Sequence, residues 1–310
     1  MLLDLSQFML IDEEKIPGSG EDSHILQLNS EYGFACALDG CGGSGARKYP
    51  EFGGRSGAYL GSRAAADTLV RWFSGNPVIP EGEKVAAAWE TCLKASLTHI
   101  REQASTGGRI TGKMVREFPT TLAGVLVRMP KKGRYLMDLF WAGDSRVYLL
   151  DGKGLHQLTR DDLQNSDPLD NLRNDAPMTN VISADARFSI HCSSLICREP
   201  GFIFAATDGA FGYLQTPMHF EAVLLSALHE AGSMEEWQEK LRAVLGKAAA
   251  DDVTLAGILY GFRTFDEVKK YYYSHLKTFW KQYRIAEKYT EQMAEELWQK
   301  YRREYEWYPV

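Results

Sequence analysis

The sequence predicts an α+β fold: an antiparallel β-sandwich flanked by helix pairs and followed by a C-terminal helical extension. Apolar, β-branched runs occur in blocks, and these blocks alternate with pairs of segments whose apolar residues recur at helical spacing. The connections within a block are too short for helical crossovers, so neighbouring strands are expected to run antiparallel. Aromatic residues become frequent after residue 262, which marks the start of the extension.

The first block contains two expected strands. Residues 25–29 alternate between apolar and polar side chains, and residues 32–38 form a compact apolar run that ends at Asp39. The short connection between them predicts a hairpin. A glycine-rich loop over residues 40–57 follows. Two segments with helical periodicity come next, over residues 58–73 and 83–103.

The second block contains three apolar runs in near succession, over residues 120–129, 134–142 and 146–151. Their short connections predict one antiparallel sheet formed by all three. The next stretch, residues 159–179, is rich in Asp and Asn and carries two prolines. A polar segment of that length is expected to be an irregular loop, and we expect it to act as a flap over the site.

The segments from residue 202 to residue 260 again combine strands with a pair of helices. Residues 202–206 are expected to form a buried strand, and residues 253–260 a closing strand. Two helices are expected between them, over residues 219–229 and 234–248. The expected domain therefore spans residues 1–262.

Residues 263–310 are expected to form an aromatic-rich helical extension. Its apolar side chains recur at alternating steps of three and four, at Leu276, Phe279, Tyr283, Ala286, Met293 and Leu297. This stripe fits one or two long helices, with Thr290 as a polar interruption. Two interpretations remain open: the extension packs on its own domain, or it is an arm that contacts a partner or forms a dimer. We expect metal binding to survive its removal from residue 265 onward.

The composition is that of a globular protein, with 310 residues, 45% hydrophobic and 25% charged residues and a net charge of −6. The negative charge argues against nucleic acid as a partner. No apolar stretch approaches the roughly 20 residues of a membrane span, and the acidic N-terminal segment does not resemble a secretory signal. The five cysteines are widely spaced without a Cys-x-x-Cys pair, so we expect reduced thiols and a cytoplasmic location.

Five short acidic patches flank the expected strands. They are Glu21-Asp22, Asp39-Gly40, Gly143-Asp144-Ser145-Arg146, Asp208-Gly209 and Asp251-Asp252. Each patch alone has a simpler explanation, because an Asp-Gly pair is usually a turn and Arg146 could merely pair with Asp144. Several carboxylates held together repel one another unless cations lie between them. Because all the donors are oxygens, the set predicts a site for Mg²⁺ or Mn²⁺.

Longer motifs connect these patches in a fixed order. They include FACALDGCGG at residues 34–43, WAGDSRVYL at residues 141–149 and the segments 158–161, 206–209 and 251–254. Together they resemble the metal-dependent Ser/Thr protein phosphatases of the PP2C (PPM) type, and the bacterial members most. The resemblance covers residues 20 to 262, and it implies an αββα sandwich.

The resemblance also implies how two metal ions would be held. Asp39 would bridge both ions, and Glu21 with the carbonyl of Gly40 would complete the shell of one. Asp208 and Asp251 would hold the other ion.

Two further carboxylates receive roles in the same way. Asp144 would bind a third, weaker ion, and Asp22 would order water at the metals, so Asp39 and Asp22 are the expected catalytic residues. The implied cofactors are two or three Mn²⁺ or Mg²⁺ ions. Asp252 stands where the family often has Asn, at a position that need not bind metal.

Two positions depart from the family pattern. The family commonly has an Arg that grips the phosphate four residues before the first Glu, and Pro17 stands there in this chain. Lys15, Arg47 and Lys48 are weak candidates to replace it, because a Lys lacks the fork of an Arg. Cys41 stands where the animal enzymes have a His, and we assign it no catalytic role because a thiol is a poor acid for this reaction.

The resemblance implies hydrolysis of phosphoserine and phosphothreonine in phosphoprotein substrates. A hydroxide that bridges the two ions would attack phosphorus in line, without a covalent intermediate. Two alternatives remain open. One is a catalytically silent relative that binds phosphoproteins or scaffolds a complex, and the other is hydrolysis of a small phosphate ester.

Overall fold

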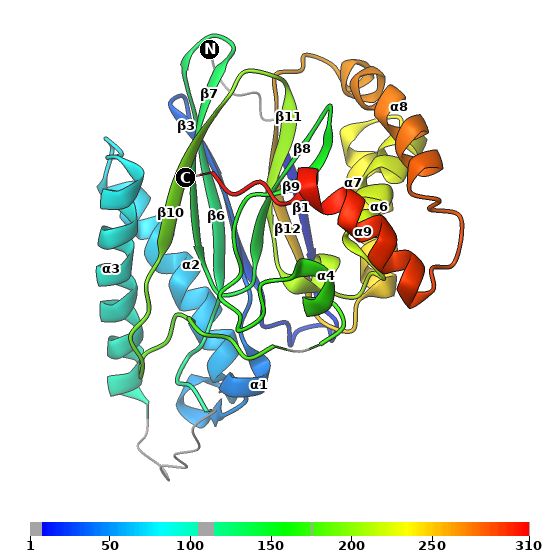
Figure 1. The fold of residues 1–310 in the computed structure, drawn as a ribbon. Coiled ribbons are helices and arrows are strands. Elements are labelled where there is room, and N and C mark those ends of the chain that lie inside the picture. The colour runs from blue at the N-terminus through cyan, green and yellow to red at the C-terminus, as the bar shows by residue number, and fades with distance from the viewer. Residues whose placement is uncertain (1–7, 105–114, 175, 310) are drawn as a thin grey trace.

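Two five-stranded antiparallel sheets stack face to face at the centre of the molecule (Figure 1). The computed structural model describes residues 8–104, 115–174 and 176–309. In spatial order, the first sheet contains β1 (Phe8–Glu13), β12 (Val253–Tyr260), β11 (Gly201–Ala206), β8 (Arg146–Asp151) and β9 (Gly154–Gln157). The second contains β10 (His191–Cys197), β7 (Arg134–Ala142), β6 (Leu122–Lys131), β3 (Tyr32–Leu38) and β2 (Ser23–Leu28). A small hairpin joins β4 (Lys48–Tyr49) to β5 (Arg55–Ser56).

Helices cover both outer faces of the sandwich (Figure 1). On the β3 side lie α2 (Gly57–Gly75) and α3 (Gly82–Gln103), and on the β11 side lie α6 (Pro217–Glu230), α7 (Met234–Ala248), α8 (Phe265–Gln282) and α9 (Glu291–Tyr305). Short helical turns occupy the loops, at α1 (Gly42–Gly45), Pro50–Phe52, α4 (Pro168–Asn171) and α5 (Asp208–Phe211). The α+β sandwich flanked by helices is therefore confirmed.

The alternation of side chains along β3 shows why this strand is apolar throughout. Phe34, Cys36 and Leu38 point to the core beneath α2 and α3, whereas Ala35 and Ala37 point to the core between the two sheets. Successive side chains of a strand face opposite sides, and both sides of β3 are covered. All seven residues of the strand are consequently buried.

Most expected elements lie where the sequence placed them, and the bounds of β7, β8, α7 and β12 coincide with the expectation. The single sheet expected for residues 120–151 is wrong. β6 pairs with β7, but β8 pairs with β9 and β11 in the opposite sheet. The reason is the tight turn at Gly143, whose φ of 92° carries the chain from one sheet to the other.

The C-terminal extension packs on its own domain, which is the first of the two interpretations left open above. Phe279, Tyr301 and Tyr305 belong to the same buried core as Tyr148 and Met218. Thr290, expected as a polar interruption, is the N-cap of α9, and its hydroxyl accepts a hydrogen bond from the Met293 N–H. A partner contact through residues 263–310 stays a prediction.

In the described parts of the chain, no helix is both long and apolar enough to cross a membrane. The five cysteines lie within these parts, and all of them are free thiols.

Candidate active site

Carboxylates from one sheet meet at one end of the sandwich because of the register of its strands. β2 and β3 pair with Ser23 opposite Leu38. Asp22 precedes the first of these residues and Asp39 follows the second, so the two carboxylates lie beside each other at the edge of the sheet.

The other sheet contributes carboxylates to the same end. Ala206 of β11 pairs with Leu255 of β12, so Asp208 and the pair Asp251-Asp252 lie beyond the same edge. The Thr207 hydroxyl donates a hydrogen bond of 2.8 Å to Asp22 Oδ2. This bond connects the two sheets beside the carboxylates.

Asp39 is fixed by the segment that precedes β6. Its N–H donates to Thr121 Oγ1 at 3.1 Å, and the Thr121 N–H donates to the Asp39 carbonyl at 2.8 Å. The Thr121 hydroxyl also shares a hydrogen bond of 2.6 Å with the Ser145 hydroxyl. Because Ser145 follows Asp144, this bond sets the turn that carries Asp144 against the strand end of Asp39.

Asp252 orients the segment that carries Glu21. Its Oδ2 accepts a hydrogen bond of 2.6 Å from the Glu21 N–H, and its Oδ1 accepts one of 2.7 Å from the Lys15 N–H. The Glu21 carboxylate itself accepts a hydrogen bond from the Ser56 hydroxyl. Asp252 is therefore used to hold the loop that precedes β2.

Gly40 allows the close approach of three backbone segments. A Cβ atom at this position would lie 2.5 Å from the Glu21 carbonyl oxygen and 2.6 Å from the Ala58 carbonyl oxygen. Neither backbone group can move away without displacing its element. Only glycine fits here.

The carboxylates repel one another in the metal-free protein. Burial, followed by the charges of Asp208 and Asp22, raises the pKa of Asp39 well above its usual value. Burial and then the charge of Asp208 raise the pKa of Asp144 to about 8. Burial also raises the pKa values of Asp22 and Glu21, with Asp252 adding to both shifts.

These observations fit a site for hard divalent cations. Asp144 Oδ1 is buried and has no hydrogen-bond partner among the described residues, and burial together with neighbouring carboxylates raises the pKa values of Asp39 and Asp144. Carboxylate and carbonyl oxygens suit Mg²⁺ or Mn²⁺. Among the described residues, no three His, Cys, Asp or Glu side chains lie close enough together to bind one metal ion. The carboxylates nevertheless lie near enough to interact through their charges.

Solved structures show the same arrangement of sheets and helices. Stp1, a Ser/Thr phosphatase of Staphylococcus aureus, matches 84% of this chain and 97% of its own, with 16% identity and a TM-score of 0.61. The catalytic domain of the Ser/Thr phosphatase PstP, solved with two manganese ions, matches 82% of this chain and 97% of its own, with 14% identity and a TM-score of 0.55. The Ser/Thr phosphatase of S. agalactiae matches 82% and 99%, with 12% identity and a TM-score of 0.57.

This chain has the fold of the bacterial PP2C-type Ser/Thr phosphatases. No family model matches the sequence. No curated protein matches it either. The likeness is therefore one of three-dimensional structure, as these identities of 12–16% indicate.

Within this PP2C-type fold, one pocket of about 270 Å³ opens beside the carboxylates. Asp144 and Asp208 line it together with Arg173 and Asn171. None of the three candidates for the phosphate, Lys15, Arg47 and Lys48, is among the described residues that line it.

The side chains of the three phosphate candidates either contact other parts of the protein or are exposed. Lys15 Nζ donates a hydrogen bond of 2.6 Å to the Ala249 carbonyl. The Arg47 guanidinium lies 4.8 Å from the centre of the Tyr49 ring, and Lys48 is exposed in the short strand β4. Their assignment to a substrate phosphate stays a prediction.

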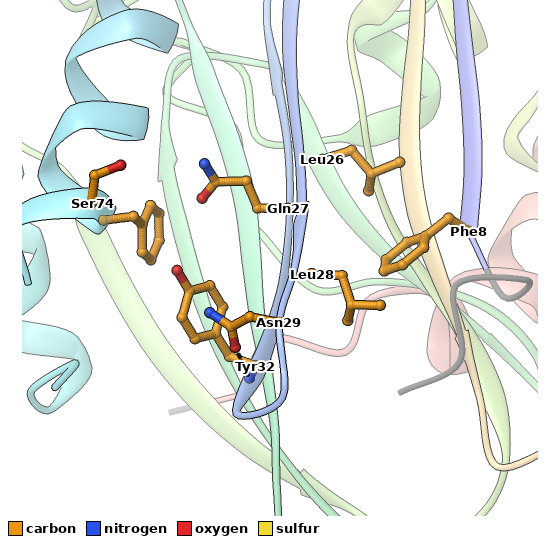
Figure 2. Close-up of a pocket in the computed structure, with 8 residues that line it drawn as sticks. Phe8, Leu26, Gln27, Leu28, Asn29, Tyr32 and Ser74 are labelled. Carbon is orange, nitrogen blue, oxygen red and sulfur yellow. Dashed lines mark hydrogen bonds between the residues drawn. The ribbon is translucent and has the colours of Figure 1, made fainter. Parts of the chain in front are cut away.

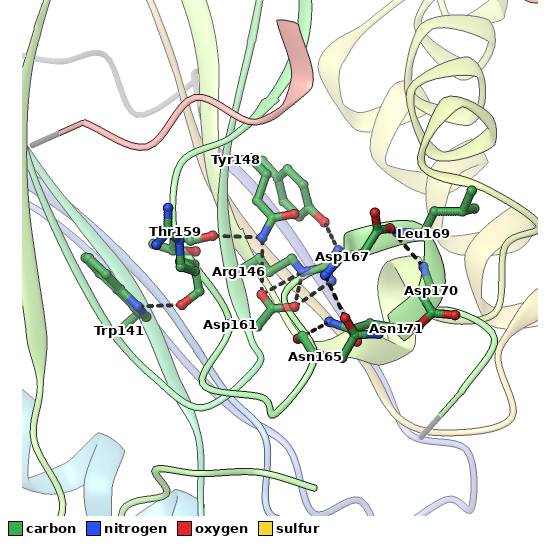
Figure 3. Close-up of polar contacts among 12 residues, drawn as sticks. Trp141, Arg146, Tyr148, Thr159, Asp161, Asn165, Asp167, Leu169, Asp170 and Asn171 are labelled. Atoms are coloured by element: carbon green, nitrogen blue, oxygen red, sulfur yellow. Dashed lines mark hydrogen bonds and ion pairs between the residues drawn. The ribbon is translucent and has the colours of Figure 1, made fainter. Parts of the chain in front are cut away.

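Arg146 pairs with Asp161, and this contradicts the simpler explanation that it pairs with Asp144 (Figure 3). Three hydrogen bonds join the guanidinium to the Asp161 carboxylate, from Nε to Oδ1 at 3.0 Å, from Nε to Oδ2 at 3.2 Å and from Nη2 to Oδ2 at 2.7 Å. The same guanidinium donates to the Tyr148 and Tyr305 hydroxyls. Asp144 thus keeps its carboxylate for another cation.

Residues 159–179 form a loop, as expected, but one with internal order. It contains α4 and an isolated bridge between Leu163 and Met178. Asp161 of this loop appeared in the sequence only as the end of the motif at residues 158–161, without a role, and Arg173 was not singled out. Nothing in a polar loop distinguishes residues that face a site from residues that face solvent, so no local pattern could have identified Arg173. The proposed flap movement stays a prediction.

A larger cavity of about 660 Å³ lies at the opposite end of β3 (Figure 2). It is lined by Phe8, Leu26, Leu28, Tyr32 and other residues near the β2–β3 turn. Tyr32 begins β3 whereas Asp39 follows its end, so this cavity is separated from the carboxylates by the length of the strand.

Proposed function

We propose that this chain is a divalent-metal-dependent phosphatase that hydrolyses phosphoserine and phosphothreonine in proteins. The observation that carries the proposal is the meeting of Asp22, Asp39, Asp144 and Asp208 from both sheets at one end of the sandwich. The support from relatives is that bacterial Ser/Thr phosphatases share this fold, and that one of them was solved with two manganese ions.

We assign the metal ligands as the sequence resemblance implies. Asp39 is proposed to bridge two ions, with Glu21 and the Gly40 carbonyl on one and Asp208 and Asp251 on the other. Asp144 is proposed to bind a third. When bound, Mn²⁺ or Mg²⁺ supplies a water of lowered pKa and neutralises charge on the phosphoryl oxygens.

The protein's own groups orient and shield this centre. Asp22 is buried, and the Thr207 hydroxyl fixes its Oδ2 at 2.8 Å, so its carboxylate can accept a proton or hydrogen bond in one defined direction. Burial raises the pKa of the Cys41 thiol well above its usual value, which keeps this thiol protonated at neutral pH. Cys41 therefore cannot supply the leaving-group proton at a useful rate.

The test is turnover of phosphoserine and phosphothreonine peptides and of p-nitrophenyl phosphate, with and without Mn²⁺. Wild-type protein is expected to release phosphate from peptides only with the metal. Asp39→Asn and Asp208→Asn are expected to lose about 10²-fold or more of kcat, the range seen when electrostatic groups are removed from active sites. Asp67→Asn, on the exposed surface of α2, is the matched control and should retain full activity.

The alternatives predict different results in the same assay. A silent relative would bind phosphopeptides without turnover at any metal concentration. An enzyme for small esters would hydrolyse p-nitrophenyl phosphate and spare the peptides. Either result would contradict the proposal.

A further inference from the structure

The pocket beside Asp144 and Asp208 is also lined by residues to which the proposed phosphatase reaction gives no role. They include Asn171, Arg173 and Asn174 of the loop around α4. The lining of one pocket thus includes the carboxylates of Asp144 and Asp208 and the guanidinium of Arg173. A volume of about 270 Å³ accommodates a group of side-chain size.

The charge of Arg173 is not paired with any group in the described part of the chain. Its guanidinium is exposed and makes no hydrogen bond or ion pair with any residue in the described ranges. The described acids of the same loop already have partners. Asp161 pairs with Arg146, and Asp170 accepts hydrogen bonds from the side chains of Asn165 and Asn174.

Another acid of the loop, Asp167, is held by the C-terminal helix α9. Asp167 Oδ1 caps α4 by accepting hydrogen bonds from the N–H groups of Leu169 and Asp170. Its Oδ2 accepts one of 2.7 Å from Arg302 Nη1 and one of 3.4 Å from Trp298 Nε1. The cap and the neighbouring Arg146–Asp161 pair are drawn in Figure 3.

A second contact of α9 lies near the same loop and is made by Tyr305. The Tyr305 hydroxyl shares a hydrogen bond of 3.2 Å with the Tyr148 hydroxyl and accepts one of 3.5 Å from Arg146. Because Arg146 holds Asp161, α9 is connected to the loop directly through Asp167 and indirectly through Arg146.

We propose that Arg173 binds an anionic group of the substrate in this pocket, and that Asp167 and α9 position it. The proposal rests on the phosphatase function proposed above. An Arg fork suits an oxyanion with two acceptors, and both a phosphoryl group and a carboxylate side chain beside the phosphoresidue have this chemistry.

The experiment measures steady-state kinetics with Mn²⁺ for Arg173→Gln, Arg173→Lys and the control Arg134→Gln. Arg134 is exposed at the β6–β7 turn, at the end of the sandwich away from the carboxylates. The substrates are a phosphopeptide with flanking acidic residues, one with neutral flanks, and p-nitrophenyl phosphate. Arg173→Gln is expected to raise KM roughly tenfold or more with little change in kcat, because a hydrogen bond to a charged group is lost. Arg173→Lys should recover part of this loss.

The pattern across substrates identifies the anion. A raised KM for the acidic peptide alone assigns Arg173 to a flanking carboxylate. A raised KM for all three substrates assigns it to the phosphoryl group. Unchanged KM values for all three, or equal effects of Arg173→Gln and Arg134→Gln, would overturn the proposal.

The positioning role has its own readout. Asp167→Asn should raise KM for the same substrates as Arg173→Gln, leave kcat unchanged, and add little to the effect of Arg173→Gln in the double variant. Additive effects, or a fall in kcat alone, would show that Asp167 does not act through Arg173.

Binding of a fluorescent phosphopeptide, followed by anisotropy with Mn²⁺, separates this proposal from the catalytic one. If binding depends on Arg173 but no phosphate is released, the anion site stands and the phosphatase function fails. If phosphate is released and Arg173→Gln binds and turns over as the wild type, the function stands and the anion site fails.

Discussion

Asp144 illustrates how a single buried carboxylate can lower the stability of the folded protein. One of its oxygens is buried without a described partner, and burial together with the charge of Asp208 raises its pKa to about 8. At neutral pH the folded, metal-free protein therefore opposes the ionisation that metal binding requires. A bound cation would offset the negative charge of Asp144, and an Asn at this position would not ionise at all.

We accordingly expect Asp144→Asn to raise the melting temperature of the metal-free protein, by about 2–4 °C for each kcal/mol of repulsion relieved. The same variant should gain less than the wild type when Mn²⁺ is added, because one ligand is missing. Differential scanning fluorimetry with EDTA and with Mn²⁺ measures both effects. A lower melting temperature in EDTA would show that the carboxylate is stabilised by a contact the account omits.

Gly40 and Gly43 form a matched pair at the same loop. A Cβ on Gly40 would lie within 2.6 Å of two backbone carbonyl oxygens, whereas a Cβ on Gly43 would meet nothing within 4 Å. Gly40→Ala is therefore expected to destabilise the protein by about 1–3 kcal/mol, the usual range for overpacking, and to abolish turnover. Gly43→Ala should leave both unchanged. Urea denaturation and the phosphopeptide assay test this, and equal behaviour of the two variants would contradict the argument.

At the scale of elements, the C-terminal helices are part of a core they share with the β11 sheet. Trp298 is completely buried in that core. Trp298→Ala is expected to cost about 3–5 kcal/mol, as for other large-to-small changes. Trp280 is 40% exposed on α8, so Trp280→Ala should cost much less. A small loss for Trp298→Ala in chemical denaturation would mean that α9 is only loosely attached.

The shared core also bears on the expectation that the extension can be removed. Truncation at residue 264 would expose the part of the core that contains Tyr148 and Met218. We now expect the truncated chain to aggregate or to unfold below 37 °C, measured by circular dichroism. A truncated chain that folds and binds Mn²⁺ would support the original expectation of a separate extension.

His156 couples β9 to α9 in a pH-dependent way. Its Nε2 lies 3.0 Å from Asp151 Oδ1 and its Nδ1 faces the Glu304 carbonyl. Both neighbours are acceptors, so both ring nitrogens act as donors in the imidazolium form. Burial opposes this charge, but the hydrogen bond and charge of Asp151 outweigh it, and Glu221 adds to them, so the pKa of His156 is raised.

A raised pKa means that the folded protein keeps a proton which the unfolded chain has lost. The contribution is complete below the unfolded pKa of about 6.5 and is lost as the pH rises through the folded value. The difference in melting temperature between wild type and His156→Gln should consequently be larger at a pH of about 5.5 than at about 9. A pH-independent difference would exclude this ion pair as the cause.

The elements also show what the sequence could and could not predict. Strongly periodic segments such as α7 and the apolar runs of β7, β8 and β12 were placed correctly, because burial imposes their pattern. β9 and β10 were missed, since Gly154–Gln157 is short and His191–Cys197 mixes Ser, Cys and His at an edge of the sheet. The crossing of β8 into the other sheet depends on one glycine turn and cannot be read from strand periodicity.

At the scale of the whole molecule, the site depends on contacts that are distant in sequence. Asp39 and Asp144 could be singled out because they end apolar runs and fall on motifs of a known family. The Arg146–Asp161 pair and the link from Arg302 to Asp167 could not, because each partner is defined by packing rather than by its neighbours in the chain. The sequence therefore predicted the carboxylates of the pocket and missed the residues that the loop around α4 contributes to it.

The two halves of the sandwich meet at the carboxylates, so ions bound there should join the two sheets. Mn²⁺ is expected to raise the melting temperature of the wild type with increasing concentration, since it binds the folded state alone. Asp39→Asn should largely lose this dependence, while Asp67→Asn keeps it. An equal Mn²⁺ effect in both variants would place the bound ion elsewhere.

The central claim is that carboxylates of both sheets hold paired divalent ions, and anomalous diffraction from crystals soaked in manganese tests it most directly. We expect at least two anomalous peaks between Asp39 and Asp208, both absent in the Asp39→Asn variant. Well-diffracting wild-type crystals without a peak at this position, or with peaks only at other surface acids, would contradict it.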